Sequence, residues 1–196
     1  MIPKKIFRIW LSDKPDLPEM IDKCFKSQEI EGYEVVTVTM ANCPVPSQFV
    51  LDAIKSKKWA KAVDYLRMWF LYTEGGIYLD ADVEMYPDKD FNDLLNQNMF
   101  MCREENGYVS NAIVGSVKGN PILKKYLETV DNNFIGSGDL VWECGMGLFN
   151  EILRTNSSYP VRIYTADYFI PFNWQKNTTN ITDNSRCVHH FLRSWT

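Results

Sequence analysis

The 196-residue sequence lacks several features that would assign it to a broad class of proteins. Its longest apolar stretches are strand-sized, whereas a membrane-spanning helix needs about 20 apolar residues. It shows no secretory leader and no excess of basic residues, since its formal net charge is −4. These absences argue against a transmembrane protein and against a nucleic-acid partner, and they leave at most a peripheral association with a membrane.

Cysteine is also sparse, and its pattern excludes two kinds of site. The five cysteines are odd in number and scattered, without the close spacing of metal-binding motifs. They are Cys24, Cys43, Cys102, Cys144 and Cys187. Such a set indicates reduced thiols rather than a disulfide framework, so we expect a cytoplasmic protein.

What the sequence does contain is enough apolar material for one core. A hydrophobic content of 45% over 196 residues predicts a single domain covering residues 1–196. Strands are expected over residues 5–10, 34–39, 77–79, 99–102, 112–116, 161–164 and 187–190. Helices are expected over residues 19–28 and 57–74 and from residue 121 to about residue 132. This alternation predicts a three-layer α/β sandwich that binds ligands at the carboxyl ends of its strands.

The most informative stretch covers residues 77–84, where a short apolar strand ends in Asp80 and Asp82. Because side chains alternate along a strand, these two carboxylates should project to the same side. Like charges held so close raise the cost of ionising each other, unless a cation lies between them. Mg²⁺ and Mn²⁺ accept carboxylate ligands and keep open positions for phosphates. The pattern favours a metal site for a phosphate-bearing substrate; the alternative is a solvated strand end.

The helix expected just before this strand carries two charged residues within an otherwise apolar segment. Asp64 and Arg67 lie three residues apart, so they are neighbours on the helix surface. Charged residues are seldom buried unless they are paired or functional. The two residues are therefore candidates for the site, and the alternative is an ion pair on the solvated face. Gly75 and Gly76 supply the stop and the turn that lead into the strand.

Residues 62–72 and 75–84 together resemble the sugar-nucleotide-binding region of glycosyltransferase family 32. This family includes yeast outer-chain mannosyltransferases and bacterial capsule and lipopolysaccharide enzymes, and it is distantly related to clostridial glucosylating toxins. Four further segments also resemble the family, in the expected order: residues 2–10, 110–115, 168–171 and 189–195. The resemblance implies a GT-A-like α/β/α sandwich around a mixed, mostly parallel sheet.

The resemblance also implies a metal centre. Asp80 and Asp82 would bind Mn²⁺ or Mg²⁺, with His189 as a further ligand. His189 and His190 are the two histidines of the chain, and adjacent residues of a strand face opposite ways, so only one of them can point into the site. The position in the motif favours His189.

The donor-binding residues are implied in the same way. Asp64 and Arg67 would hold the hydroxyls of the donor sugar and would count, with the two aspartates of the metal site, as catalytic. Trp10 would stack on the nucleobase, and Tyr78 would contact the ribose or phosphates; for both, the alternative is core packing. Asn111 would hydrogen-bond the sugar hydroxyls, unless it is a turn residue.

The closing motif contributes two more candidates. Ser194 and Trp195 would close over the diphosphate and donate hydrogen bonds to its oxygens. The alternative is a frayed tail, because the last residues of a domain are often poorly ordered.

The implied function is metal-dependent transfer of a hexose from a nucleotide-diphosphate sugar, with retention of anomeric configuration. A UDP-hexose is favoured over GDP-mannose, and the acceptor would be an oligosaccharide or lipid-linked glycan in surface polysaccharide or lipopolysaccharide synthesis. One alternative is a catalytically silent nucleotide-sugar-binding module. Another is a phosphatase of the haloacid-dehalogenase type, which also places Asp-X-Asp after a strand. In such a phosphatase, however, the motif stands near the start of the core rather than after a long helix.

Overall fold

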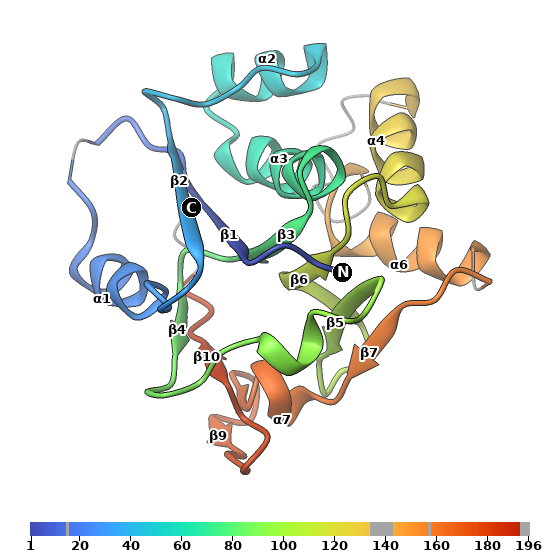
Figure 1. The fold of residues 1–196 in the computed structure, drawn as a ribbon. Helices are drawn as coiled ribbons and strands as arrows, with labels where there is room; N and C mark the ends of the chain where they lie inside the picture. Colours follow the sequence, from blue (N-terminus) through green and yellow to red (C-terminus); the bar gives the residue numbers. More distant parts are fainter. Residues whose placement is uncertain (15, 134–142, 157, 193–196) are drawn as a thin grey trace.

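A computed structural model describes residues 1–14, 16–133, 143–156 and 158–192 and shows a six-stranded central sheet (Figure 1). The strand order is β2-β1-β3-β6-β5-β7. These strands are β1 (Lys5–Trp10), β2 (Glu34–Thr39), β3 (Gly76–Leu79), β5 (Met99–Arg103), β6 (Val109–Ser116) and β7 (Arg162–Tyr164). Within this sheet β6 runs antiparallel to both of its neighbours, and the other strand pairs are parallel. The expected mixed, mostly parallel sheet is therefore confirmed.

Helices cover one face of the sheet (Figure 1). They are α2 (Gln48–Lys55), α3 (Trp59–Thr73), α4 (Pro121–Asn133) and α6 (Met146–Thr155). Helix α3 lies against the sheet and also contacts α2 and α4. Leu66, Met68 and Leu71 of α3 are fully buried, because a helix that is apolar on most of its circumference packs on several sides at once. Helix α3 is therefore held firmly beside the end of β3.

The opposite face is covered by shorter elements. They are α1 (Glu19–Ser27), the 3₁₀ turn η1 (Asn92–Leu94), α7 (Ala166–Phe169) and a two-stranded sheet of β4 (Val83–Met85) and β10 (Cys187–His189). Alternate residues of the strands supply this second core: Ile77 and Leu79 face it, whereas Tyr78 faces the core under α3. A small hairpin, β8 (Phe172–Asn173) and β9 (Thr178–Thr179), adjoins this layer (Figure 1). The α/β class is thus confirmed, with α1 and several short elements as the second outer layer.

The expectation that strand alternation places Asp80 and Asp82 was wrong. Strand β3 ends at Leu79, and Asp80 to Asp82 form a turn in which the Val83 amide donates to the Asp80 carbonyl over 3.0 Å. The two aspartates are therefore not placed by strand alternation. The turn arises because the chain leaves the central sheet here and enters β4 of the small sheet.

The edge of the sheet where the parallel strands end collects polar and aromatic residues from several elements. Trp10 ends β1, Asp80 follows β3, and Glu104 follows β5. Because β6 runs in the opposite direction, its early residue Asn111 lies at the same edge. This edge is where open α/β sheets bind ligands. Among the described residues, no helix combines the length and the apolar character needed to cross a membrane.

Candidate active site

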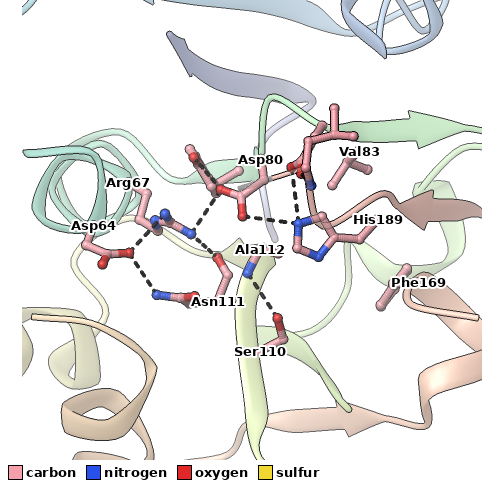
Figure 2. Close-up of polar contacts among 12 residues, drawn as sticks. Asp64, Arg67, Asp80, Val83, Ser110, Asn111, Ala112, Phe169 and His189 are labelled. Atoms are coloured by element: carbon pink, nitrogen blue, oxygen red, sulfur yellow. Dashed lines mark hydrogen bonds and ion pairs between the residues drawn. The ribbon is translucent and has the colours of Figure 1, made fainter. Parts of the chain in front are cut away.

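The turn after β3 and the short strand β10 bring two carboxylates and an imidazole together. His189 pairs with Val83 of β4, which places its ring beside the turn (Figure 2). The His189 Nε2 lies 3.1 Å from Asp82 Oδ1 and 3.8 Å from Asp80 Oδ2. One ligand atom from each of these residues lies within 4.8 Å of the other two. The adjacent His190 turns the other way and contacts Glu84 over 2.9 Å.

The donor set fits a hard divalent cation. Both ring nitrogens of His189 are buried, and neither has a hydrogen-bond partner among the described residues, although Nε2 faces the two carboxylates. Ligand atoms of one octahedral Mg²⁺ lie roughly 3 Å apart when adjacent and about 4 Å apart when opposite. Two carboxylates and an imidazole nitrogen at this spacing offer the oxygen and nitrogen ligands that Mn²⁺ accepts.

The charges around this cluster shift its protonation. Burial acts to raise the pKa of Asp82, but the neighbouring His189 and the Leu192 amide, which donates over 2.8 Å, bring that pKa below its usual value. Burial raises the pKa of Asp80 despite the neighbouring Arg67 guanidinium. Burial acts to lower the pKa of His189, but Asp82 and Asp80 raise it above its usual value. A proton and a metal ion therefore compete for this imidazole, since only neutral histidine is a ligand.

Arg67 connects the helix α3 to this cluster (Figure 2). Its Nη2 lies 2.9 Å from Asp64 Oδ1, and its Nη1 lies 3.1 Å from Asp80 Oδ1. Nη1 also donates to the Asn111 carbonyl over 2.8 Å, and the Asn111 amide donates to Asp64 Oδ1 over 3.1 Å. The Tyr78 hydroxyl donates to Asp80 Oδ1 over 2.8 Å, and its ring lies 4.7 Å from the guanidinium. One arginine thus joins the Asp64 carboxylate of α3 and the Asp80 carboxylate after β3 in a single network.

This network is buried, so the solvated ion pair considered above is wrong for Asp64 and Arg67. Their exposed fractions are 7% and 6%. Burial raises the pKa of Asp64 to about 6, even though Arg67 acts in the opposite direction. A buried ion pair adds little to stability in comparison with apolar packing. The pair is therefore better explained by what it holds in place than by its contribution to folding.

The network and the acidic cluster line a cavity of about 260 Å³. Trp10 is half-buried against it, and its indole Nε1 is buried without a hydrogen-bond partner in the described part of the chain. Tyr78 also borders the cavity but is fully buried. Its ring therefore packs in the core, as the alternative expected, while its hydroxyl binds Asp80. Asn111 lies within β6, and the turn-residue alternative for it is wrong. Ser194 and Trp195 lie outside the described residues.

The structure adds residues that the sequence reasoning missed. The cavity is also lined by Trp59 at the start of α3, by Gly145 and Met146 before and in α6, and by Glu104 and Phe191. Glu104 was open to prediction, because it follows a strand at the ligand-binding edge. Phe191 belongs to the closing motif, and its ring centroid lies 4.0 Å from that of His189.

The sequence is similar to several known proteins. The sequence matches the family model of capsular polysaccharide synthesis proteins over residues 1–190. It is 35% identical over 110 residues to Toxin Afp18 of Yersinia ruckeri, a match that covers 52% of this chain and 5% of the toxin. It is 23% identical over 214 residues to an uncharacterized glycosyltransferase of Acanthamoeba polyphaga mimivirus, covering 100% of this chain and 84% of that protein. The chain thus spans a small part of the first relative and most of the second.

A solved structure shares the fold. The PaToxG glycosyltransferase superposes with a TM-score of 0.58 at 20% identity, covering 79% of this chain and 69% of that chain. At this level of identity the likeness concerns the fold, and it agrees with the mixed α/β sheet described above.

Proposed function

Because the chain belongs to the family of capsular polysaccharide synthesis proteins and is a glycosyltransferase by its relatives and fold, we propose that it transfers a hexose from a nucleotide-diphosphate sugar with the help of a divalent metal. The donor is a UDP-hexose, ahead of GDP-mannose, and the acceptor is a saccharide of a surface polysaccharide or lipopolysaccharide. One observation carries the proposal: Asp80, Asp82 and His189 converge beside the buried Asp64–Arg67 pair on one cavity. Residues 1–196 would act as one domain, at most peripherally bound to the inner face of a membrane.

The acidic cluster would hold the metal. Asp82 and His189 are proposed as direct ligands, and Asp80 binds directly or through the ribose and a water molecule. Bound Mn²⁺ or Mg²⁺ supplies a Lewis acid for the negative charge that forms on the departing diphosphate. Tyr78 and Arg67 keep Asp80 oriented through the contacts given above.

The remaining residues would bind and orient the donor. Asp64 and Arg67 hold the hydroxyls of the sugar, and Asn111 supports both of them from β6. Trp10, with its unpaired indole N–H on the cavity, stacks on the nucleobase. Ser194 and Trp195 are proposed to donate hydrogen bonds to the diphosphate.

Retention of configuration is proposed with attack of the acceptor hydroxyl from the face that the diphosphate leaves. Neither Asp64 nor Asp80 is proposed as a covalent nucleophile, because the Arg67 guanidinium pairs with Oδ1 of both carboxylates and offsets the negative charge that a nucleophile needs. The same engagement of Asp80 argues against the phosphatase alternative, in which the first aspartate must attack phosphorus. Proton NMR of the first product checks the stereochemistry; an inverted linkage would contradict retention and direct attention to Glu104 as a base.

The decisive experiment measures donor turnover with Mn²⁺ or with EDTA. The donors are UDP-glucose, UDP-galactose, their N-acetyl counterparts and GDP-mannose, and a phosphomonoester serves as the phosphatase probe. We expect one nucleotide sugar to be turned over with Mn²⁺ only, and Asp82→Ala and His189→Ala to lower that rate by about 100-fold or more, since each removes support for the main charge stabiliser. His190→Ala is the matched control, because His190 faces Glu84 instead of the cluster.

Three results would contradict the proposal. Turnover that continues in EDTA would show that the reaction does not depend on a divalent metal. Hydrolysis of the phosphomonoester would favour a phosphatase. Tight, Mn²⁺-dependent binding of UDP without any turnover would leave a silent binding module.

A further inference from the structure

A second hollow adjoins the cavity at its outer end. We call it the side hollow; it is lined by Glu104, Glu105, Asn106, Ile170, Phe172, Asn173, Trp174, Gln175 and Phe191. It shares Glu104 and Phe191 with the cavity, so the two adjoin at these residues. Its enclosed volume is only about 20 Å³, so any ligand larger than a water molecule would lie across its open mouth. Since the Phe191 ring lies against that of His189, at an angle of 40°, the side hollow begins beside a candidate metal ligand.

Aromatic rings lead outward from the metal cluster through this hollow. The ring centroids of His189 and Phe191 are 4.0 Å apart, and those of Phe191 and Trp174 are 6.4 Å apart. Trp174 lies in the turn between β8 and β9, and 44% of it is exposed. A large aromatic ring is thus presented to solvent at the mouth of the site.

The hairpin that carries Trp174 is fixed against the turn between β5 and β6. The Asn173 amide donates to the Glu105 carboxylate, and Lys176 Nζ pairs with the same carboxylate over 3.0 Å. Glu105 is thereby neutralised, and Trp174 is held between two anchored residues. The ring is therefore positioned in advance rather than on a free loop, which lowers the ordering cost of binding.

Glu104 gives the side hollow its polar wall. Its carboxylate accepts a hydrogen bond from the Asn106 amide over 2.8 Å. Among the described residues, no lysine, arginine or histidine nitrogen lies within ion-pair distance of it, so it keeps acceptor capacity toward the two spaces that it lines. An ionised carboxylate of this kind accepts hydrogen bonds from hydroxyl groups.

We propose that the mouth of the side hollow is the acceptor subsite and that a neutral saccharide ring lies across it, with its C–H face on Trp174 and Phe191 and its hydroxyls toward Glu104. The inference rests on the proposed function. A sugar ring has an apolar face and a polar edge, and this hollow offers the same combination. A protein acceptor would require an interface of about 1,000 Å² or more, whereas the lining of the side hollow includes one exposed large apolar side chain, that of Trp174.

The test uses Mn²⁺ in the cavity as a reporter of nearby protons. Proton relaxation of lactose, maltose and chitobiose is compared with Mn²⁺ and with diamagnetic Mg²⁺, each in the presence of UDP and the full chain. We expect the ring protons of at least one disaccharide to relax faster with Mn²⁺, and Trp174→Ala to reduce that enhancement by about fivefold or more, the scale of losing an aromatic contact. Trp174→Phe keeps a flat ring and should retain most of the effect, whereas Glu104→Gln should weaken it.

Ile181→Ala is the control, because Ile181 is 61% exposed and lines neither the cavity nor the side hollow. Calorimetric titration of UDP with Mn²⁺ runs in parallel. If UDP binds with Mn²⁺ but no disaccharide is affected, or if Trp174→Ala equals wild type, the acceptor subsite is wrong while the proposed function stands. If UDP shows no Mn²⁺-dependent binding to wild type, both fall together. If Trp174→Ala fails to fold, an undiminished signal in Glu104→Gln overturns the inference.

Discussion

At the scale of single residues, the buried surroundings of Asp64 change the pKa of its carboxyl group. Its pKa is about 6 in the folded chain, against 3.8 when it is unperturbed, because burial disfavours the charged form. Between these values the folded protein holds a proton that the unfolded chain has lost. The contribution of Asp64 to the free energy of unfolding therefore falls as pH rises from about 4 to 6. Above pH 6 the cost of burying the ionised carboxylate is fully present and no longer changes with pH.

This pH dependence is measurable by comparison with Asp64→Asn, which cannot titrate. We expect the free energy of unfolding of wild type, minus that of the variant, to decrease between pH 4 and pH 7. Denaturant titrations at several pH values give the difference, and subtraction cancels the titration of distant groups. A difference that is constant or that rises with pH would show that Asp64 stays ionised when folded.

The same substitution separates sugar binding from nucleotide binding. Asp64 lies on the Arg67 side of the cavity, away from the Asp82–His189 pair, so Asp64→Asn should weaken the use of a nucleotide sugar but leave the affinity for free UDP nearly intact. A hydrogen bond to a charged group is worth about 1.5–3 kcal/mol, so kcat/KM should fall by roughly 10- to 100-fold. Steady-state kinetics and UDP titration check this; equal kinetics in both proteins would leave Asp64 with a structural role only.

Sequence reasoning at this scale found the pair but not its burial. The charges of Asp64 and Arg67 within an apolar helix predicted either a site or a surface ion pair. The contact between Arg67 and Asp80 joins a helix to a strand end, and only tertiary packing creates it. The convergence of Asp82 with His189 was implied by the family motif, since no local pattern connects residues so far apart.

At the scale of secondary-structure elements, the junction between α3 and β3 depends on Gly75. Its φ is +72°, and a Cβ there would lie 2.7 Å from the Lys118 amide nitrogen. Gly119 has the same φ, but a Cβ there would meet no atom within 4 Å. Replacing Gly119 by alanine would therefore add only the conformational cost of a positive φ, whereas replacing Gly75 would add a steric clash as well.

Gly119→Ala should destabilise the protein by about 1–2 kcal/mol, the cost of the left-handed conformation for an L-residue. Gly75→Ala should cost clearly more, because the backbone of residue 118 must also move. Urea denaturation of both variants tests this. Equal losses would show that the Gly75 junction tolerates the shift without strain.

Elements with strong local patterns were predicted well. The strands at Lys5–Trp10 and Glu34–Thr39 have the expected bounds, because each is an apolar run between polar or glycine-containing turns. Helices α2 and α6 and strand β4 were missed. Strand β4 has three residues and exists through its pairing with β10, so its existence depends on a distant segment. The extended geometry assumed for Asp80–Asp82 was wrong for the same reason.

At the scale of the whole molecule, ligand binding should change stability through the acidic cluster. The chain has a formal net charge of −4, and the cluster holds two of its carboxylates close together, where a cation would neutralise them. A ligand at 100 times its Kd stabilises the native state by about 2.7 kcal/mol. For a chain of this size that corresponds to a rise in Tm of about 5–10 °C.

We therefore expect Mn²⁺ with UDP to raise the Tm of wild type by several degrees, EDTA to abolish the effect, and Asp82→Ala to remove most of it. Differential scanning fluorimetry is sufficient for the measurement. A shift of equal size in Asp82→Ala would mean that the ion binds elsewhere on the chain.

The α/β class and the edge of the sheet at which the cavity lies were predictable at this scale, because both follow from strand–helix order. The composition of the second outer layer was not, because it is made of short elements without strong periodicity.

The antiparallel pairing of β10 with β4 has a consequence for how the enzyme is made. Domains begin to fold from the amino-terminal side while the ribosome is still at work. The six-stranded sheet is complete once β7 has emerged, but His189 arrives only with β10. If His189 is a metal ligand as proposed, a nascent chain would pair the strands of the central sheet before all three side chains of the cluster were present. Emergence of β10 from the ribosome would then be the step that completes both the cluster and the second core, to which Cys187 belongs.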